Sequence, residues 1–402
     1  MTFTDSFAAP ASYLPAVETV VTTSTEMGGR VADVIDFVTR RGFVFEPWQV
    51  AAFITAVRTK PFVILAGISG TGKTKLPRLV ADATGATCEV VPVRPDWTDS
   101  GEVLGSERLS GAFAPGPLLR VAREAMSNPE RQYFFMLDEM NIARVEYYLA
   151  EVLTHIEEKT RAGDVVQSKP LAPDAPLDAN GQTWSDVVLP SNLCIVGSVN
   201  MDETTHGFSR KVLDRSFVLE FSEIDLSKTE AAENPAPANW AVSDWKQTYL
   251  SLGEFPQPDD PTVLRVISVL TVLNVSLAAV QTQVGYRVRD EIALFCIHAR
   301  DCAESFGRSG GLQVDPLDLA VTVKVLPRLQ GGGATIRRVL KDLLTWAEGA
   351  SASASTDDGA EPDSDLTPVE DDGAGDRFPL CAERVRLMIA RHDESGFTSY
   401  WL

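Results

Sequence analysis

Apolar runs and segments of helical spacing alternate over the first half of the chain. The apolar runs predict buried strands at residues 61–67, 88–93, 132–139, 192–200 and 217–221. Apolar positions at helical spacing predict two helices within 31–57 and further helices at 73–84 and 141–159. Strands that alternate with helices are typical of an α/β domain with a mainly parallel sheet.

The pattern changes beyond Phe221. Residues 223–260 are polar and contain several prolines, which indicates a connector. Helical spacing then predicts helices at 261–281, 288–306, 315–329 and 334–348. The acidic, low-complexity stretch 351–376 is nearly free of bulky apolar residues, so we expect it to be disordered. The last residues return to a helical pattern and are expected to pack on the helical domain.

A chain of 402 residues exceeds a single ordinary domain, which agrees with this division. We predict, in chain order, an N-terminal helical lead-in, an α/β core, a helical lid with its connector, an acidic insertion and a C-terminal helix. The boundaries are residues 1–45, 46–222, 223–349, 350–376 and 377–402.

The composition is that of a globular protein, with 44% hydrophobic residues and a net charge of −20. Part of this charge is local, since residues 350–376 hold nine Asp or Glu and no Lys or Arg. An acidic surface disfavours extensive nucleic-acid binding by the chain alone, because phosphate contacts need basic side chains. Acidity also simply keeps a protein soluble.

The five cysteines are scattered without a CxxC pair, which argues against a disulfide framework and a zinc site. His206 lacks a His or Cys at ligand spacing, so we interpret it as structural. No basic segment followed by an apolar core opens the chain, and no apolar run approaches 18 residues. We therefore expect a cytoplasmic protein without membrane contact.

Residues 67–74 match the pattern GxxxxGK[ST] between a predicted strand and a predicted helix. Glycines let the backbone curl so that its N–H groups converge on phosphate oxygens, and the helix N-terminus adds its dipole. Lys73 would neutralise the β- and γ-phosphates, and the Thr74 hydroxyl would hold Mg²⁺. The residues predicted to bind nucleotide here are Gly67, Ile68, Ser69, Gly70, Thr71, Gly72, Lys73 and Thr74.

Polar side chains also end two later strands. Asp138, at the end of 132–139, would orient Mg²⁺, and Glu139 would activate the attacking water. Asn200, at the end of 192–200, would face the γ-phosphate and position water, although Asn is also a common turn former. With the phosphate loop, these residues predict hydrolysis of a nucleoside triphosphate.

Arginines supply the remaining candidates. Arg210 and Arg215 follow Asn200, and either could stabilise transition-state charge on a neighbouring subunit's nucleotide, with Arg215 favoured over Arg210. In the helical domain, Arg287 or Arg289 would contact nucleotide from the lid. The alternative for each is an ordinary salt bridge with a nearby acid.

Glycine and proline turn signals around residues 109–113 indicate a hairpin inserted into the core. Arg94, Trp97, Arg108 and Phe113 could contact a partner or a translocated polymer there. Burial of Trp97 in the core is an equal alternative.

Three segments together carry a family resemblance. LAGISGTGKTKL, FFMLDEMNIARVEYYLAEVL and GSVNMDETTHGFSRKVLDRSF resemble the AAA+ superfamily and, more narrowly, its McrB-like branch. VRPDWTD, GPLL, YRVRDE, the stretch 318–331 and the closing GFTSYW support this likeness, which covers about residue 40 onward except the acidic insertion. The phosphate loop and the acidic pair are generic to AAA+ proteins, whereas the second and third segments are more specific.

The resemblance implies an AAA+ core with an all-α lid, a hexameric ring with nucleotide between subunits, and Arg215 as the trans-acting arginine. It further implies Mg²⁺, GTP or ATP as substrate, and an McrC-like nuclease partner stimulated by hydrolysis. The family's MNxxDR run appears here as VNMDET, with Asp202 two positions after Asn200, which leaves GTP and ATP both open. The stretch before the phosphate loop is too short for a separate DNA-reading domain, so DNA would be bound through partner subunits.

A MoxR-like chaperone ATPase that remodels protein partners is the alternative, since it would share the motor and the inserted hairpin. A small-molecule P-loop kinase explains neither Asn200 nor Arg215.

Overall fold

The computed structural model describes residues 26–162, 165–201, 206–222, 227, 232–349 and 376–401. The acidic insertion, with the disorder expected there, therefore lies outside the described residues except for Asp376. Asp202 of the VNMDET run also lies outside them.

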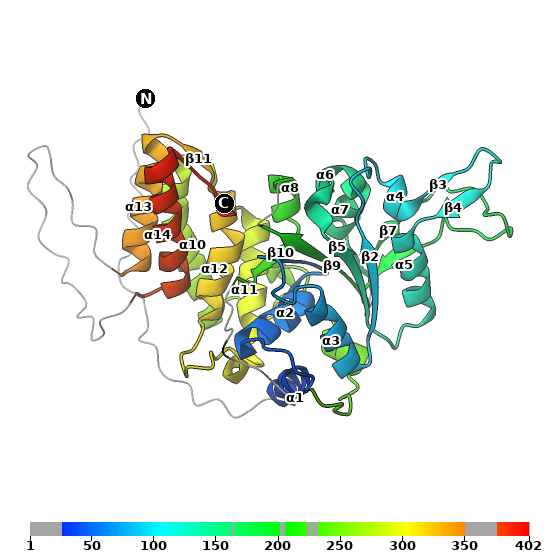
Figure 1. The fold of residues 1–402 in the computed structure, drawn as a ribbon, viewed down its shortest axis with the longest axis horizontal. Coiled ribbons are helices and arrows are strands. Elements are labelled where there is room, and N and C mark those ends of the chain that lie inside the picture. The colour runs from blue at the N-terminus through cyan, green and yellow to red at the C-terminus, as the bar shows by residue number, and fades with distance from the viewer. Residues whose placement is uncertain are drawn as a thin grey trace, which may run out of the picture.

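A five-stranded parallel sheet forms the centre of the first domain, in the order β10-β1-β9-β5-β2 (Figure 1). Its strands are β1 (Phe62–Gly67), β2 (Thr87–Pro92), β5 (Tyr133–Asp138), β9 (Leu193–Asn200) and β10 (Phe217–Glu220). All five strands were predicted from apolar runs, and the α/β parallel-sheet class is confirmed. Since every strand runs the same way, the residues that follow β1, β5 and β9 meet at one edge, which we call the carboxyl edge. The opposite edge is the amino edge.

Alternation along β1 explains why the sheet is covered on both faces. Val63 and Leu65 pack into one apolar layer, whereas Phe62, Ile64 and Ala66 pack into another. Helices α1 (Glu26–Arg40), α2 (Pro47–Thr59) and α3 (Lys75–Thr84) contribute to the first layer. Helices α5 (Pro117–Ser127), α6 (Val145–Tyr148), α7 (Ala150–Glu157) and α8 (Arg210–Leu213) contribute to the second.

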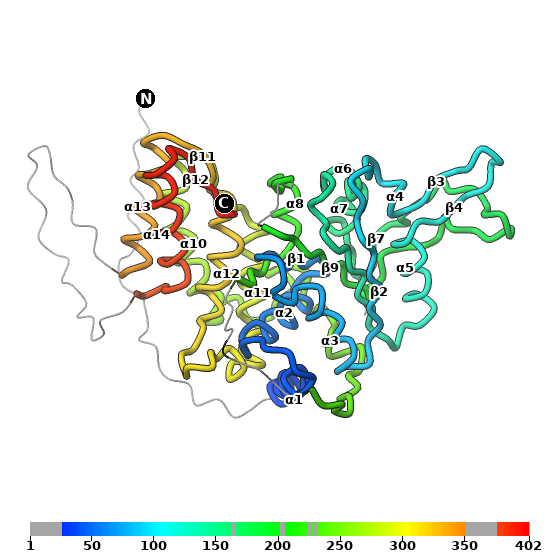
Figure 2. Tube along the Cα trace, viewed as in Figure 1, coloured from blue at the N-terminus to red at the C-terminus, as the bar shows by residue number. Residues whose placement is uncertain are grey.

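A helical lid follows the sheet in the chain and lies against its β10 edge (Figures 1 and 2). Its helices are α10 (Pro261–Ala278), α11 (Tyr286–Arg300), α12 (Pro316–Lys324), α13 (Ala334–Ala347) and α14 (Pro379–Ser395), after the short α9 (Val242–Trp245) of the connector. The ring of Phe217 stacks on Phe295 of α11 at 4.5 Å between centroids, so lid and sheet share one apolar layer. The C-terminal α14 packs on α13 and α12, and β12 (Phe397–Thr398) pairs with β11 (Gly331–Gly332).

Aspartate-proline pairs start two lid helices. Asp260 accepts a hydrogen bond from the Thr262 N–H at 2.8 Å, and Asp315 accepts one from the Leu317 N–H at 2.9 Å. In both, the following proline occupies the first helical position, where its missing N–H costs nothing.

The helix predicted at 141–159 is instead broken into three short pieces: Met140–Ile142, α6 and α7. Ala143 is extended, and the Tyr148 hydroxyl donates to the Met140 carbonyl at 2.7 Å across the break. Because Met140, Val145 and Tyr148 are all buried, packing beneath the sheet overrides the helical spacing.

Two strands of a small antiparallel sheet lie in the proline-rich stretch 162–190 before β9, where the sequence predicted no strand. β6 (Thr160–Ala162), β7 (Val165–Pro170) and β8 (Val188–Pro190) pair in that order. The stretch lacks a regular alternation of apolar residues, which is why it gave no strand signal.

The inserted hairpin is present, as predicted, and projects far from the lid (Figure 1). It consists of β3 (Gly105–Glu107) and β4 (Phe113–Pro115), preceded by the short helix α4 (Gly101–Leu104). Trp97 and Phe113 are buried, and Trp97 packs edge-on against Tyr148. Burial of Trp97 in the core, the alternative that the sequence left open, is therefore confirmed, and the proposed partner contact is wrong for Phe113.

Helix α10 is long and apolar enough to cross a membrane by length and composition, with a mean hydropathy of 1.7 over 18 residues. It is amphipathic in its packing, however, because Val266, Leu270, Leu273 and Leu277 are buried in the lid. A buried helix of a globular domain meets the same criterion, so this helix is weak support for a membrane span.

Candidate active site

The phosphate loop connects the end of β1 to the start of α3. Gly67 has φ +150°, and a Cβ there would lie 2.2 Å from the Phe221 carbonyl oxygen. Gly72 has φ +86°, and a Cβ there would lie 2.9 Å from the ring of Phe45. Both positions therefore require glycine, and the backbone curls ahead of the α3 N-terminus as the motif predicts.

Lys73 lies within the curl of this loop and is only 4% exposed. Its Nζ donates to the Ile68 carbonyl oxygen and, at 3.4 Å, to the Thr71 hydroxyl. These neutral acceptors are part of the loop itself, so the ammonium is already placed where phosphate oxygens would converge.

A chain of hydrogen bonds joins the ends of three elements at the carboxyl edge. The Thr74 hydroxyl donates to Asp138 Oδ1 at 2.7 Å, and the Ser198 hydroxyl donates to the same oxygen at 2.6 Å. Ser198 Oγ in turn accepts from the Glu139 backbone N–H at 2.9 Å. The predicted loop and acidic pair, 64 residues apart at Thr74 and Asp138, are thus brought into direct contact.

Thr74 and Asp138 fit a magnesium ion held together with substrate phosphates. Mg²⁺ prefers hard oxygen ligands and is usually bound by one or two carboxylates plus phosphate oxygens. The hydroxyl and carboxylate oxygens that converge here supply that donor set. Among the described residues there is no group of three or more His, Cys, Asp and Glu side chains that could hold a metal ion instead.

Glu139 adopts a left-handed backbone conformation, with φ 53° and ψ 48°. Such a conformation is uncommon for a residue with a side chain and concentrates at functional sites. The side chain is exposed, and its Oε1 accepts a hydrogen bond from Asn200 Nδ2 at 3.3 Å. The backbone turn therefore presents the Glu139 carboxylate to solvent beside Asn200.

The sequence reasoning missed Ser198. This residue lies two positions before Asn200 on β9, so both side chains point to the same face of the strand. The sequence signal was this two-residue spacing near the end of a buried strand. It places the Ser198 hydroxyl on the same face as Asn200 and near the same edge of the sheet. In the structure Ser198 contacts both members of the acidic pair.

We expect Ser198→Ala to lower kcat/KM for nucleotide hydrolysis by about tenfold, since losing one charge-assisted hydrogen bond costs about 1.5–3 kcal/mol when measured by mutation. The loss should follow from a misplaced Asp138. The measurement is steady-state hydrolysis over a range of Mg²⁺ concentrations. The control is Ser185→Ala, which removes a half-buried hydroxyl that is hydrogen-bonded to Thr183 and distant from the carboxyl edge in sequence. Equal kinetics for both variants would show that Ser198 has no such role.

A cavity of about 560 Å³ opens at the carboxyl end of β10. Glu220 and Ser222, at the end of β10, line one side of it, and residues of α12 and α14 line the other. Glu220 pairs in register with Ala66, one residue before the phosphate loop begins. The volume is in the range of small-molecule sites.

Arg215 lies at the other end of the sheet. β10 runs parallel to β1 with Phe217 opposite Val63, so Arg215 precedes the strand at the amino edge. Along β1 the sheet is six residues deep, or roughly 20 Å at 3.3 Å per residue. An arginine side chain cannot span that depth, so Arg215 does not reach the phosphate loop of its own chain.

The two lid arginines that were predicted to contact nucleotide, Arg287 and Arg289, have different ion-pair partners. Arg287 forms an ion pair with Glu157, which also pairs with Arg215. Arg289 pairs with Asp290, the alternative that the sequence left open. Arg210 is exposed, and its Nη1 donates to the Gln281 carbonyl at 3.4 Å. Nucleotide contact by Arg287 or Arg289 stays a prediction, and for Arg287 it would involve a neighbouring subunit.

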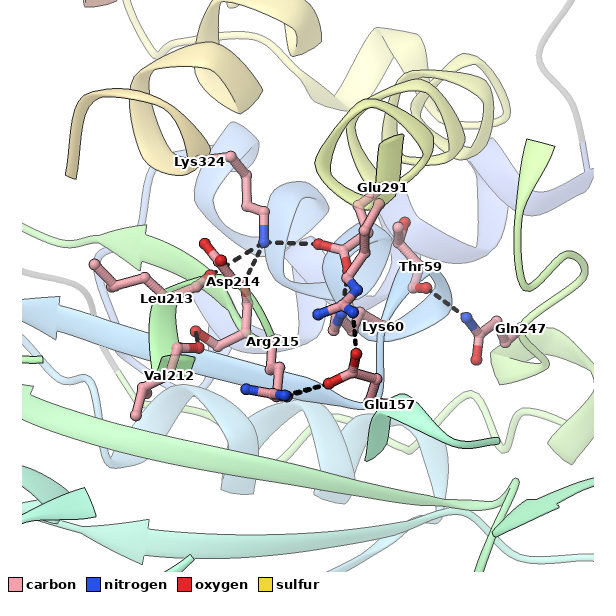
Figure 3. Close-up of polar contacts among 12 residues, drawn as sticks. Thr59, Lys60, Glu157, Val212, Leu213, Asp214, Arg215, Gln247, Glu291 and Lys324 are labelled. Carbon is pink, nitrogen blue, oxygen red and sulfur yellow. Dashed lines mark hydrogen bonds and ion pairs between the residues drawn. The ribbon is translucent and has the colours of Figure 1, made fainter. Parts of the chain in front are cut away.

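A buried ionic network ties the lid to this amino edge (Figure 3). Lys324 of α12 lies 2.7 Å from Glu291 of α11, and Lys60, just before β1, pairs with the other oxygen of Glu291. Lys324 also donates to the Ser216 carbonyl at 2.6 Å. Burial lowers the pKa of Lys324 to about 8. Burial raises the pKa of Glu291, but attraction to the two lysines outweighs it and the net pKa is lowered, so both groups are charged at neutral pH.

Lys324→Met should lower the free energy of unfolding by about 3 kcal/mol, because breaking a buried pair strands its partner's charge. Lys60 still compensates Glu291, which places the loss at the lower end of the usual range. Denaturant unfolding measures it, with the exposed Lys341→Met of α13 as the control. Equal unfolding midpoints for the two variants would contradict a structural role for this network.

Two family models match parts of this chain. Residues 62–215 match the AAA domain (dynein-related subfamily), and residues 237–397 match a domain of unknown function, DUF8727. No curated protein matches the sequence. The chain is also similar to the crystal structure of a candidate ATPase from Cytophaga hutchinsonii, at 12% identity and a TM-score of 0.46 over 75% of this chain and 87% of that one. Residues 62–215, which carry the phosphate loop and strands β1, β2, β5 and β9 of the parallel sheet, are thus similar to an AAA domain, and a helical region follows them.

Proposed function

We propose that the protein is a Mg²⁺-dependent nucleoside triphosphatase of the AAA+ class whose active sites are completed by a neighbouring subunit. The hydrogen-bonded chain from Thr74 through Asp138 and Ser198 to Glu139 is the observation that carries this proposal. It joins residues from three distant parts of the sequence beside a loop shaped for phosphates.

Each residue has a chemical task in this proposal. Backbone N–H groups of the loop and the Lys73 ammonium bind the phosphates. A magnesium ion held at Thr74 and Asp138 supplies charge neutralisation on the phosphate oxygens. Glu139 accepts the proton of the attacking water, and Asn200 holds the Glu139 carboxylate in place by the 3.3 Å hydrogen bond.

The position of Arg215 supports assembly into an oligomer. Phosphoryl transfer is accelerated strongly by an arginine that neutralises the developing charge. Arg215 lies at the amino edge, away from its own phosphate loop, so its target is the nucleotide of a second copy. Head-to-tail contacts of this kind close into rings, and the family resemblance favours a hexamer.

For the biological role we propose a motor subunit of an McrBC-like restriction or anti-phage complex, which drives a nuclease partner that brings DNA. The DEMN-x-AR and DRS segments support this reading, and the acidic composition agrees with DNA being bound by partners. The MoxR-like chaperone remains the second candidate. Its supporting observation is the projecting β3–β4 hairpin, whose Leu109 is fully exposed as a contact residue for a protein partner would be.

Hydrolysis of ATP and of GTP by the purified protein, with and without the product of the adjacent gene, tests this proposal. We expect Mg²⁺-dependent hydrolysis of at least one nucleotide and a faster rate with a nuclease partner. No hydrolysis of either under any condition would refute the triphosphatase assignment. A MoxR-like chaperone would have a von Willebrand A-type protein encoded beside it instead of a nuclease. Stimulation by such a protein would overturn the restriction role in favour of the chaperone.

A further inference from the structure

Glu157, the last residue of α7, contacts two arginines that come from different parts of the chain. Its Oε2 accepts from Arg215 Nε at 2.7 Å and pairs with Arg215 Nη2, while its Oε1 pairs with Arg287 Nη2. Figure 3 shows Arg215 and Glu157 facing each other beneath the Lys324–Glu291 pair. Sequence patterns gave no hint of this glutamate, because its partners lie 58 and 130 residues away.

One carboxylate between two guanidinium groups holds them side by side. The two cations would otherwise repel each other. Each arginine uses a separate oxygen of Glu157, and Arg215 Nη1 also donates to the Lys211 carbonyl at 3.1 Å. The cluster keeps a net charge of +1 and is only partly exposed, with Arg287 at 44% and Arg215 at 21%.

The buried network sets the position of Arg287. Glu291 lies four residues after Arg287 on α11, which is one helical turn and the same face. Since Glu291 is anchored between Lys60 and Lys324, α11 is fixed against the sheet and Arg287 is brought to Glu157. The lid and the sheet thus each contribute one arginine to a single cluster.

We propose that Glu157 is a positioning residue, which holds Arg215 and Arg287 as a pair that faces the triphosphate of the neighbouring subunit. The inference rests on the proposed function, because it assigns a partner to the trans-acting arginine. A nucleoside triphosphate carries the anionic charge that two neighbouring guanidinium groups recognise, and guanidinium donors suit phosphate oxygens. Glu157 itself touches no substrate.

Glu157→Gln should lower kcat for hydrolysis by about 10–100-fold, because misplacing a catalytic group by about 1 Å has that effect. The affinity for nucleotide should not change, since the phosphate loop lies at the other edge of the sheet. The control is Glu158→Gln, which removes the neighbouring acid that pairs with the exposed Lys169. Hydrolysis rates and binding of a fluorescent ATP or GTP analogue give the two quantities.

Mixing subunits separates positioning from damage to the fold. Glu157→Gln subunits mixed with Lys73→Ala subunits should regain hydrolysis. The Lys73→Ala subunits present an intact arginine pair to the nucleotide that is bound by the Glu157→Gln subunits. Failure to regain it, an unchanged kcat or a raised kcat in Glu157→Gln would each overturn the inference, and a raised kcat would identify Glu157 as a brake. Arg215→Ala tells the two proposals apart: if that variant is inactive while Glu157→Gln matches wild type, only the positioning role fails. If Arg215→Ala is fully active, the proposed function fails first.

Discussion

Glu139→Gln is expected to lower nucleotide hydrolysis by about 10²–10⁴-fold, the usual contribution of general acid–base catalysis. The amide has the shape of the carboxylate and keeps an oxygen for the hydrogen bond from Asn200. It cannot, however, take a proton from the attacking water. Nucleotide binding should persist because the phosphate loop and its Lys73 are untouched. Phosphate-release kinetics and equilibrium binding measure the two effects on the same protein.

Glu130→Gln is the control for this change, since Glu130 is an exposed carboxylate in the turn before β5. It should behave as wild type in both assays. Hydrolysis by Glu139→Gln at the wild-type rate would remove Glu139 from the mechanism, and a loss of nucleotide binding would mean that the residue shapes the site instead.

Arg215→Ala is expected to reduce hydrolysis by about 10³-fold or more, which is the scale of arginine effects in phosphoryl transfer. The reason is loss of positive charge at the neighbour's transition state, so kcat should fall far more than the affinity for nucleotide. Arg210→Ala is the informative comparison, because Arg210 begins the short helix just before Arg215 but donates its hydrogen bond to the Gln281 carbonyl of the lid. Its effect should stay below about tenfold, within the range of a single hydrogen bond.

If Arg210→Ala lowered the hydrolysis rate more than Arg215→Ala did, Arg210 and not Arg215 would be the trans-acting arginine. Steady-state hydrolysis at protein concentrations that favour assembly is the measurement. Size-exclusion chromatography of each variant shows whether assembly itself has changed.

The sheet and its carboxyl edge were predictable because their signals are local. An apolar run that ends in Gly67 predicts the buried strand and the phosphate loop that follows it. Asp138 and Asn200 lie at the ends of two further apolar runs. Because parallel strands all end at the same edge of the sheet, these residues are expected to lie close together. In the structure Thr74 accordingly contacts Asp138. The alternation of apolar runs with helical segments was sufficient to predict the fold class.

Features that depend on tertiary packing were not predictable. Phe113 has the sequence context of an exposed hairpin, yet its ring is buried, and the sequence left partner contact and burial equally open for Trp97. The break between α6 and α7 depends on burial of Tyr148 and its hydrogen bond to Met140. Glu157 belongs to a helix whose spacing marks it only as a solvent-facing acid, and its partners come from the turn before β10 and from the lid.

The claim that one active site is shared between two subunits is tested most directly by mixing two inactive variants. Arg215→Ala keeps its phosphate loop, and Lys73→Ala keeps its Arg215, so each supplies what the other lacks. In a random equal mixture within a closed ring, about one interface in four pairs an intact loop with an intact arginine. We therefore expect the mixture to hydrolyse nucleotide at roughly a quarter of the wild-type rate. A mixture no more active than its separate components would contradict a shared site.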